Sequence, residues 1–227
     1  MATSEAVLDQ ELDPELEALT ATDPASIPPD VGDVDDGGLD TDVLFDAAPP
    51  TAGLSADQRI RARDRAMAAA TLALQHNTEM HYTEDTPAQL AAQGGTPRRW
   101  DGIQKHRNAR LGQFPAYADC SSFATWCLWN GLHLGFSAAD VVNGESWSGG
   151  YTGSMLRHGS PVASADEMQR GDCVLYGDPG TTGKHTAIFV GRQSDGTLMV
   201  ISHGGPGGPH FLKYDYRTDI MGFRRYI

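Results

Sequence analysis

The feature that most constrains the fold is a series of short apolar segments between Gly171 and Ile227, separated by turn-forming residues. Segments rich in β-branched and aromatic residues and bounded by Gly, Pro and Asp are typical of β-strands. This part of the chain is therefore expected to form a sheet. We expect five strands, over residues 173–176, 186–190, 198–202, 211–214 and 222–227.

Two helices are expected before the sheet. Ser55 supplies a side-chain N-cap for the first helix, with Gln58 three residues later, and this helix should run to about Asn77. The second should run from Asp119, its N-cap, to about Asn130. Helices followed by an antiparallel sheet define an α+β fold class.

The charge of the chain is unevenly distributed. The formal net charge is -13, from 30 acidic and 17 basic residues. Residues 1–56 hold 14 of the acidic residues and no basic ones, whereas the rest is nearly neutral. High charge with a single aromatic residue disfavours a packed core, so we predict an acidic disordered arm over 1–54 and a folded domain over 55–227. The leucine spacing within 5–19 allows one short helix there, and the arm is either a solvated leader, which we favour, or a docking element for a partner.

Two classes of function are disfavoured by these patterns. A nearly neutral body lacks the concentrated Lys and Arg that nucleic-acid binding requires. The apolar runs fall far short of the roughly 18 residues needed to span a bilayer. Glu5 and Asp9 stand where a signal peptide would be basic and then apolar. We therefore expect no membrane span and no signal peptide, and we expect synthesis in the cytoplasm.

Cys120 is the candidate nucleophile. It follows the expected N-cap Asp119 and so lies at the positive end of a helix dipole, which favours the thiolate. Backbone N–H groups of the first helical turn also point where an oxyanion would develop. Three cysteines without C-x-x-C spacing do not indicate a disulfide framework. Cys127, inside the helix, and Cys173, in an apolar strand, are expected to be buried structural thiols.

His185 and His203 are the candidate general base and orienting group. His185 begins one expected strand, and His203 directly follows the strand at 198–202. If these strands are antiparallel neighbours joined by the turn at Asp195-Gly196, both histidines lie at the same end of the sheet. Each alone would more often be an ordinary core or surface histidine. Together with a helix-capped cysteine, they form a plausible base and orienter pair.

Four sequence blocks occur in an order that is known from one enzyme family. They are Asp119-Cys120-Ser121-Ser122-Phe123, Gly171-Asp172 before the strand at 173–176, Lys184-His185-Thr186-Ala187-Ile188-Phe189-Val190-Gly191, and Ile201-Ser202-His203. The first resembles the Asp-Cys-Ser-Gly-Phe motif of the NlpC-type papain-like cysteine peptidases that cut bacterial cell walls. The other three are similar to that family's Gly-Asp-Leu-Val-Phe segment, its Gly-His-Val-Gly-Ile-Tyr-Val-Gly strand and the position of its third catalytic histidine. The four blocks together are more specific than any one of them.

The resemblance implies a papain-like fold, with the nucleophile at a helix N-terminus packed on an antiparallel sheet. It implies cleavage of an amide bond in a peptidoglycan stem peptide, without a cofactor or a metal. Cys120 would be the nucleophile, His185 the general base and then acid, and His203 the group that orients His185. The family's usual target is the γ-D-glutamyl to diaminopimelate bond, and cross-bridge and muramoyl-alanine bonds stay open. A base of this type predicts activity that rises through the imidazole pH range.

The resemblance also implies substrate contacts. Tyr82 is placed like an upstream tyrosine that shapes the oxyanion and substrate site, and Asp119 and Ser121 are expected to contact the peptide. Ser122 departs from the family pattern, which has glycine there. The long segment 131–161 is a second departure, and it either lines the substrate groove or caps the core.

A finer resemblance is to peptidase domains encoded by phages of actinobacteria, often in their lysins. It rests on His81-Tyr82, Arg99-Trp100, Tyr117-Ala118-Asp119-Cys120 and Tyr151-Thr152-Gly153. Such enzymes reach the wall through a holin or inside a virion. The resemblance therefore implies a phage lysin or a virion-associated enzyme that acts at the cell wall.

Three other functions stay open. A zinc hydrolase could use His185, His203 and His210 with Cys173 or an acidic residue, but no H-x-x-x-H or C-x-x-C spacing supports it. A phage structural protein could retain the fold as a scaffold and dock through the acidic arm. A cysteine amidase, deamidase, toxin effector or acyltransferase would share the first chemical step with a peptidase.

Overall fold

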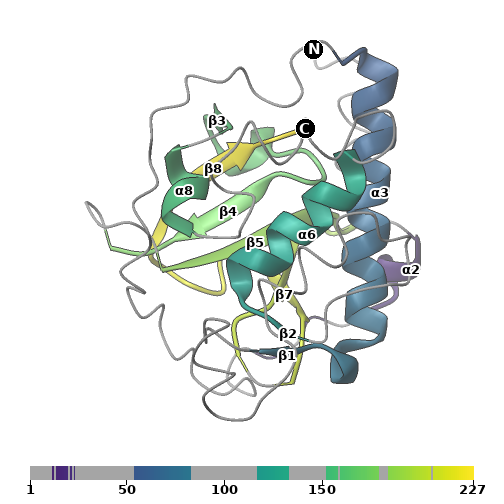
Figure 1. Ribbon diagram of the computed structural model, residues 1–227, viewed down its shortest axis with the longest axis vertical. Coiled ribbons are helices and arrows are strands. Elements are labelled where there is room, and N and C mark those ends of the chain that lie inside the picture. The colour runs from purple at the N-terminus through teal and green to yellow at the C-terminus, as the bar shows by residue number, and fades with distance from the viewer. Residues whose placement is uncertain are drawn as a thin grey trace.

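Figure 1 shows the computed structural model, in which two long helices, α3 and α6, accompany an antiparallel sheet. The structure describes residues 12, 14–19, 21, 23, 54–82, 117–132, 152–157, 159–178, 184–205 and 207–227. The helices and the sheet confirm the predicted α+β class. None of the helices in these ranges is long and apolar enough to cross a membrane.

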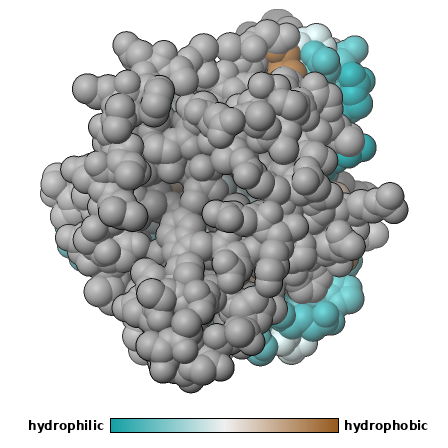
Figure 2. Space-filling view, in the orientation of Figure 1, coloured by the Kyte–Doolittle hydropathy of each residue, from teal (hydrophilic) through white to brown (hydrophobic). Residues whose placement is uncertain are grey.

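Helix α3 (Ala56–Gln75) begins where the sequence predicts. The Ser55 hydroxyl accepts a hydrogen bond from the Gln58 backbone N–H at 3.2 Å, and the Gln58 side chain accepts one from the Ser55 N–H at 2.8 Å. This reciprocal capping box satisfies two of the N–H groups that a helix start leaves unpaired. The outer side of α3, along the right edge of Figure 2, is predominantly hydrophilic.

The main sheet has six strands in the order β3-β8-β4-β5-β6-β7, and all neighbouring strands are antiparallel. The strands are β3 (Ser160–Val162), β4 (Cys173–Tyr176), β5 (His185–Arg192), β6 (Leu198–Ser202), β7 (His210–Lys213) and β8 (Ile220–Arg225). The five predicted strands are present, some with shifted ends. The sixth, β3, was not predicted, because three residues that include Pro161 carry no alternating pattern. A proline is tolerated there because β3 lies at the edge of the sheet.

Alternate residues of the strands face two different hydrophobic clusters. Ile188 on β5 and Ile201 on β6 belong to the cluster that also contains the inner faces of α3 and α6. Ala187 and Phe189 belong to a second cluster on the opposite face. Both helices therefore cover the same face of the sheet, as expected from the period-2 alternation of strand side chains.

Helix α6 (Cys120–Leu132) packs closely against α3 because the contact is built from small residues. Ala62, Ala66 and Ala70 on α3 are buried in it. A Cβ on Gly131 of α6 would lie 2.3 Å from the Ala62 carbonyl oxygen, so only glycine fits there. This close approach holds the axis of the helix that carries Cys120.

The Gly171-Asp172 block joins β4 to β8. The Asp172 carboxylate is 1 % exposed and accepts two hydrogen bonds from Arg225, at 2.8 and 2.6 Å. It also accepts one from the Gln169 backbone N–H at 2.7 Å. Burial raises the pKa of Asp172, and the contacts with Arg225 oppose that shift. This block therefore has a structural role, because the ion pair between Asp172 and Arg225 fixes the start of β4 next to β8.

Part of the predicted acidic arm packs on the domain. Leu12 and Leu16, from the short helix α2 (Pro14–Glu17) and its approach, lie in the helix-side core. The Leu12 N–H donates to the Arg192 carbonyl at 3.3 Å, and the Ser194 N–H donates to the Glu17 carboxylate at 3.0 Å. Leucines four residues apart form a small apolar face here. The short helix that the leucine spacing allowed within 5–19 is present over Pro14–Glu17. The rest of the arm lies outside the described residues, and its boundary at residue 54 stays a prediction.

Candidate active site

Cys120 is the first residue of α6 and is fully buried. Asp119 caps this helix, because its carboxylate accepts a hydrogen bond from the Ser122 backbone N–H at 2.6 Å. The predicted position of the thiol at the positive end of a helix is confirmed. Such a position stabilises a thiolate relative to a thiol.

Ser122, which departs from the family glycine, completes this cap. Its hydroxyl accepts a hydrogen bond from the Asp119 backbone N–H at 2.8 Å. The two residues therefore satisfy each other, as in a capping box with serine at the third helical position. The spacing Asp-x-x-Ser is the sequence signal that could have predicted this role.

Ser121 and Asp119 were expected to contact substrate, and both are buried in the structure. The Ser121 hydroxyl donates to the Asp119 carboxylate at 3.2 Å. Both side chains thus form part of the cap next to the thiol. Their contact with a substrate stays a prediction.

Thr152 is a neighbour of the thiol that sequence reasoning did not single out as a site residue. It is the first residue of α8 (Thr152–Arg157), and its hydroxyl oxygen lies 3.9 Å from Cys120 Sγ. Its side chain is buried. The only sequence signal was its place in a block that resembles the phage-encoded domains, because a contact across 32 positions leaves no periodic pattern.

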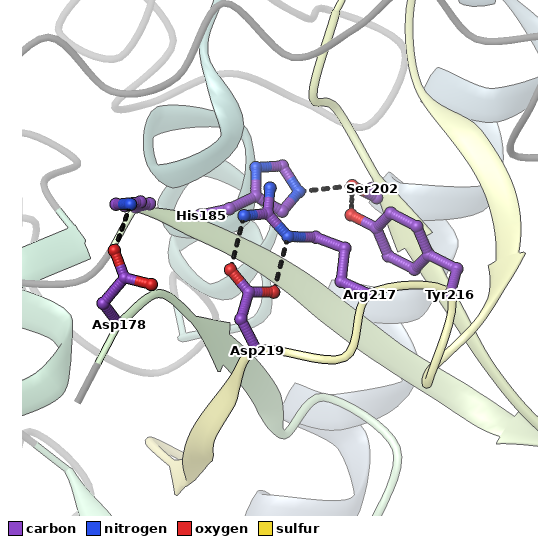
Figure 3. Close-up of polar contacts among 7 residues, drawn as sticks. Asp178, His185, Ser202, Tyr216, Arg217 and Asp219 are labelled. Carbon is purple, nitrogen blue, oxygen red and sulfur yellow. Dashed lines mark hydrogen bonds and ion pairs between the residues drawn. The ribbon is translucent and has the colours of Figure 1, made fainter.

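His185 is the first residue of β5, as predicted, and is 1 % exposed. Figure 3 shows one of its polar contacts: the Nε2 atom lies 2.7 Å from the Ser202 hydroxyl oxygen. That hydroxyl lies 3.1 Å from the Tyr216 hydroxyl. The imidazole is therefore linked to a serine and a tyrosine that the sequence analysis did not assign to the site.

The pairing of β5 with β6 explains why Ser202 rather than His203 meets this nitrogen. Ala187 pairs with Ser202, so these two side chains share a face of the sheet, and His185 is two residues from Ala187 on that same face. His203 is the next residue after Ser202, and its ring contacts groups on the helix side. The predicted antiparallel pairing is confirmed, and both histidines lie at the same end of the sheet.

Packing holds the His185 ring from several sides. The Tyr176 ring lies 5.7 Å away between centroids, and the Tyr216 ring meets it edge-on at 6.4 Å. A Cβ on Gly204 would lie 2.7 Å from His185 Cε1 and 3.3 Å from Nε2. The absence of a side chain at Gly204 is therefore what makes room for the ring.

Charged groups near His185 act on its protonation. Arg217 donates two hydrogen bonds to Asp219, at 2.9 and 2.7 Å, and its guanidinium lies 5.6 Å from the Tyr176 ring centroid. The pKa of His185 is lowered to about 3, chiefly by burial and also by Arg217 and His203, while Asp219 opposes the shift. An exposed ion pair between Lys184 and Asp178 adjoins the strand start (Figure 3). His185 is consequently a neutral imidazole at pH 7, which is the form that accepts a proton.

His203 occupies a separate buried position. Its ring contacts Tyr82 edge-on at 5.3 Å and Phe123, in the first turn of α6, at 6.0 Å. Burial lowers the pKa of His203 to about 4, and backbone groups of Gly208, His81 and Ala118 oppose that shift. His203 therefore lies near the start of the cysteine helix and is neutral at pH 7.

Tyr82 reaches this region through a second, two-stranded sheet. Strand β1 (His81–Tyr82) pairs in parallel with β2 (Tyr117–Ala118), which leads directly into the Asp119 cap. The predicted site residue Tyr82 thus comes from a strand beside the nucleophile's own segment. Arg99-Trp100 and most of the segment 131–161, including Tyr151, lie outside the described residues.

Two contacts connect the segments that carry the candidate residues. Phe123, three residues after Cys120, contacts the His203 ring. Gly204, which directly follows His203, lies so close to His185 that an added Cβ would meet its ring. The structure thus groups Cys120 with Thr152, His185 with Ser202 and Tyr216, and His203 with Tyr82 and Phe123.

The other two cysteines are free and buried, as predicted. Burial raises the pKa of both the Cys127 and Cys173 thiols, so neither has thiolate character at neutral pH. Within the described ranges, no three His, Cys, Asp or Glu side chains come together in an arrangement that could hold a metal ion. His185, His203, His210 and Cys173, the residues considered for a zinc site, are among the side chains that form no such arrangement.

Comparison with known proteins yields one curated relative and two solved structures of note. The chain is 29% identical over 124 residues to the peptidoglycan DL-endopeptidase CwlO of Bacillus licheniformis, covering 53% of this chain and 24% of that protein. The chain thus spans about a quarter of that relative's length. Structures of NlpC2 and NlpC1 from Trichomonas vaginalis align over 71% of this chain, and over 46% and 44% of theirs, at 17% identity with TM-scores of 0.38 and 0.39. No family model matches the chain.

Proposed function

We propose that this protein is a cysteine peptidase that hydrolyses an amide bond in a peptidoglycan stem peptide. The observation that carries the proposal is the position of Cys120 at a capped helix N-terminus. The buried, neutral His185 at the start of β5 supports it as a candidate base. Similarity to a protein named as a peptidoglycan endopeptidase supports the substrate class. The order of the four sequence blocks supports a papain-like fold of the NlpC type.

In the proposed first step, Cys120 Sγ attacks the scissile carbonyl carbon and His185 accepts the thiol proton. The negative charge that develops on the carbonyl oxygen is stabilised by backbone N–H groups at the start of α6. Collapse of this intermediate breaks the C–N bond, and the proton on His185 goes to the leaving amine. The product of this step is a thioester on Cys120.

In the second step, water attacks the thioester carbonyl and His185 accepts a proton from it. The thiolate of Cys120 leaves and is reprotonated, which regenerates the enzyme. Burial of His185 shifts the expected acid limb of the activity profile below the ordinary imidazole range, because its pKa is lowered to about 3.

The biological setting is proposed on the resemblance alone. We propose a lysin or virion-associated enzyme of an actinobacterial phage, made in the host cytoplasm and acting at the cell wall. The catalytic domain would span residues 55–227, and the acidic arm would be free to bind a partner beyond its docked stretch. The γ-D-glutamyl to diaminopimelate bond is the first candidate for cleavage.

The test is digestion of purified actinobacterial peptidoglycan, with released fragments identified by mass spectrometry. Wild type should release peptide fragments whose new termini identify the bond, and Cys120→Ala should release none. Cys127→Ala is the matched control, because it removes a buried thiol from the same helix and should retain hydrolysis. Fragments that persist in Cys120→Ala would contradict the proposal, and a folded wild type without fragments would favour another amide substrate or a scaffold role.

A further inference from the structure

We propose that Ser202 and Tyr216 form a hydroxyl relay that positions His185, and that His203 does not serve as its orienting group. This inference rests on the proposed function, because it concerns the base of that reaction. Two contacts carry it: His185 Nε2 lies 2.7 Å from the Ser202 hydroxyl, and that hydroxyl lies 3.1 Å from the Tyr216 hydroxyl. All three side chains are drawn together in Figure 3.

The two hydroxyls allow the relay to run in either direction, because each of them can donate and accept a hydrogen bond. A base for the thiol needs the direction in which Nε2–H donates to Ser202 and the Ser202 hydroxyl donates to Tyr216. In that direction the neutral imidazole carries its proton on Nε2 and its lone pair on Nδ1. That nitrogen is the one we assign to accept the thiol proton of Cys120.

The relay also acts after the proton has moved. The imidazolium then donates through Nε2–H to Ser202, and a hydrogen bond that involves a charged group is stronger than a neutral one. This contact stabilises the charged state at a site where burial, Arg217 and His203 oppose it and Asp219 favours it. The Tyr176 and Tyr216 rings supply apolar walls around the same ring.

His203 is assigned a different place by the same geometry. Its ring lies against Tyr82 and Phe123, on the helix side of β6, whereas Ser202 shares the face of His185. The residue that fills the orienting position is therefore one place earlier in the sequence than the resemblance implies. Ser202 and Tyr216 are positioning residues, because they act through His185.

The kinetic test compares Ser202→Ala and Tyr216→Phe with wild type on a soluble muropeptide. We expect Ser202→Ala to lower kcat about 10- to 100-fold with little change in KM, from loss of a hydrogen bond to a charged group. Tyr216→Phe should have a smaller effect, and the double variant should lose little more than Ser202→Ala alone. Ser202→Thr, which keeps the hydroxyl, should recover most of the activity.

Thr186→Val is the matched control. Like Ser202→Ala, it removes a buried strand hydroxyl. The Thr186 hydroxyl donates to the Val174 carbonyl at 3.1 Å, and it lies next to His185 in the sequence but on the other face of β5. It should retain kcat. A Ser202→Ala variant that is folded and fully active would overturn the relay.

A readout without substrate separates the relay from the proposed function. Long-range ¹H–¹⁵N spectra of the histidines in wild type should show His185 with its proton on Nε2, and Ser202→Ala should shift that equilibrium toward Nδ1–H. A wild-type proton on Nδ1, or spectra unchanged in folded Ser202→Ala, would overturn the relay whatever the activity. The expected tautomer in a protein that does not cleave peptidoglycan would keep the relay and overturn only the proposed function.

Discussion

Gly204 is the position at which the smallest change should most disturb the candidate base. A Cβ there would lie 2.7 Å from His185 Cε1, whereas ordinary contacts of this kind begin at about 3.4 Å. The Gly204→Ala variant must therefore move the imidazole by about 0.7 Å, or shift the backbone of the segment after β6. A misplacement approaching 1 Å at a reacting group can lower the rate about 100-fold.

The assay is steady-state hydrolysis of a soluble muropeptide, with folding checked by circular dichroism. We expect kcat/KM to fall between about 10- and 100-fold while the fold is retained. Gly196→Ala is the control, because no atom lies within 4 Å of the added Cβ and the site is at the far end of the β5–β6 hairpin. Its φ of +91° predicts a modest loss of stability and no direct effect on the chemistry. Wild-type kcat/KM in a folded Gly204→Ala variant would refute the role assigned to His185.

Three further predictions concern stability. Ser122→Ala leaves the buried Asp119 N–H without its acceptor and should lower the free energy of unfolding by about 1–3 kcal/mol in urea titrations, with no loss contradicting the capping role. The pKa values of His185 and His203, about 3 and about 4, lie below the ordinary value near 6.5, so the unfolded state binds more protons as the pH falls. The free energy of unfolding should therefore be about 2 kcal/mol lower at pH 5 than at pH 7.5 for each histidine. A higher free energy of unfolding at pH 5 would contradict the buried neutral rings. Leu16→Ala should lower the free energy of unfolding by about 2–5 kcal/mol, because Leu16 is part of the helix-side core. An unchanged thermal midpoint would show that this segment does not contribute to stability.

The sequence was sufficient to predict the elements that carry local signals. The capping box at Ser55 and the cap at Asp119 are encoded within four residues, and both helices begin where these signals place them. The β6 strand has the predicted limits, because Leu198 to Ser202 is an apolar run between two turns. The position of Cys120 at a helix start follows from the same local reasoning.

The residues that the sequence analysis did not assign to the site are brought there by contacts between distant parts of the chain. The sequence did not assign Ser202 to the site, because the sheet face that its side chain takes depends on the register between β5 and β6. Tyr216 and Thr152 reach the site through tertiary packing, and no spacing in the sequence connects them with His185 or Cys120. The docking of Leu16 was missed because composition, averaged over a charged segment, hides two well-placed leucines.

In the proposed mechanism, Cys120 forms a thioester with the stem peptide. The most direct measurement is acid quenching of the enzyme during turnover on a soluble muropeptide, followed by proteolysis and mass spectrometry of the cysteine-containing peptides. The proposed mechanism predicts an acyl adduct on the peptide that contains Cys120, attached at that thiol, and none on Cys127 or Cys173. Continued hydrolysis with no adduct at Cys120, together with undiminished activity of Cys120→Ala, would contradict it.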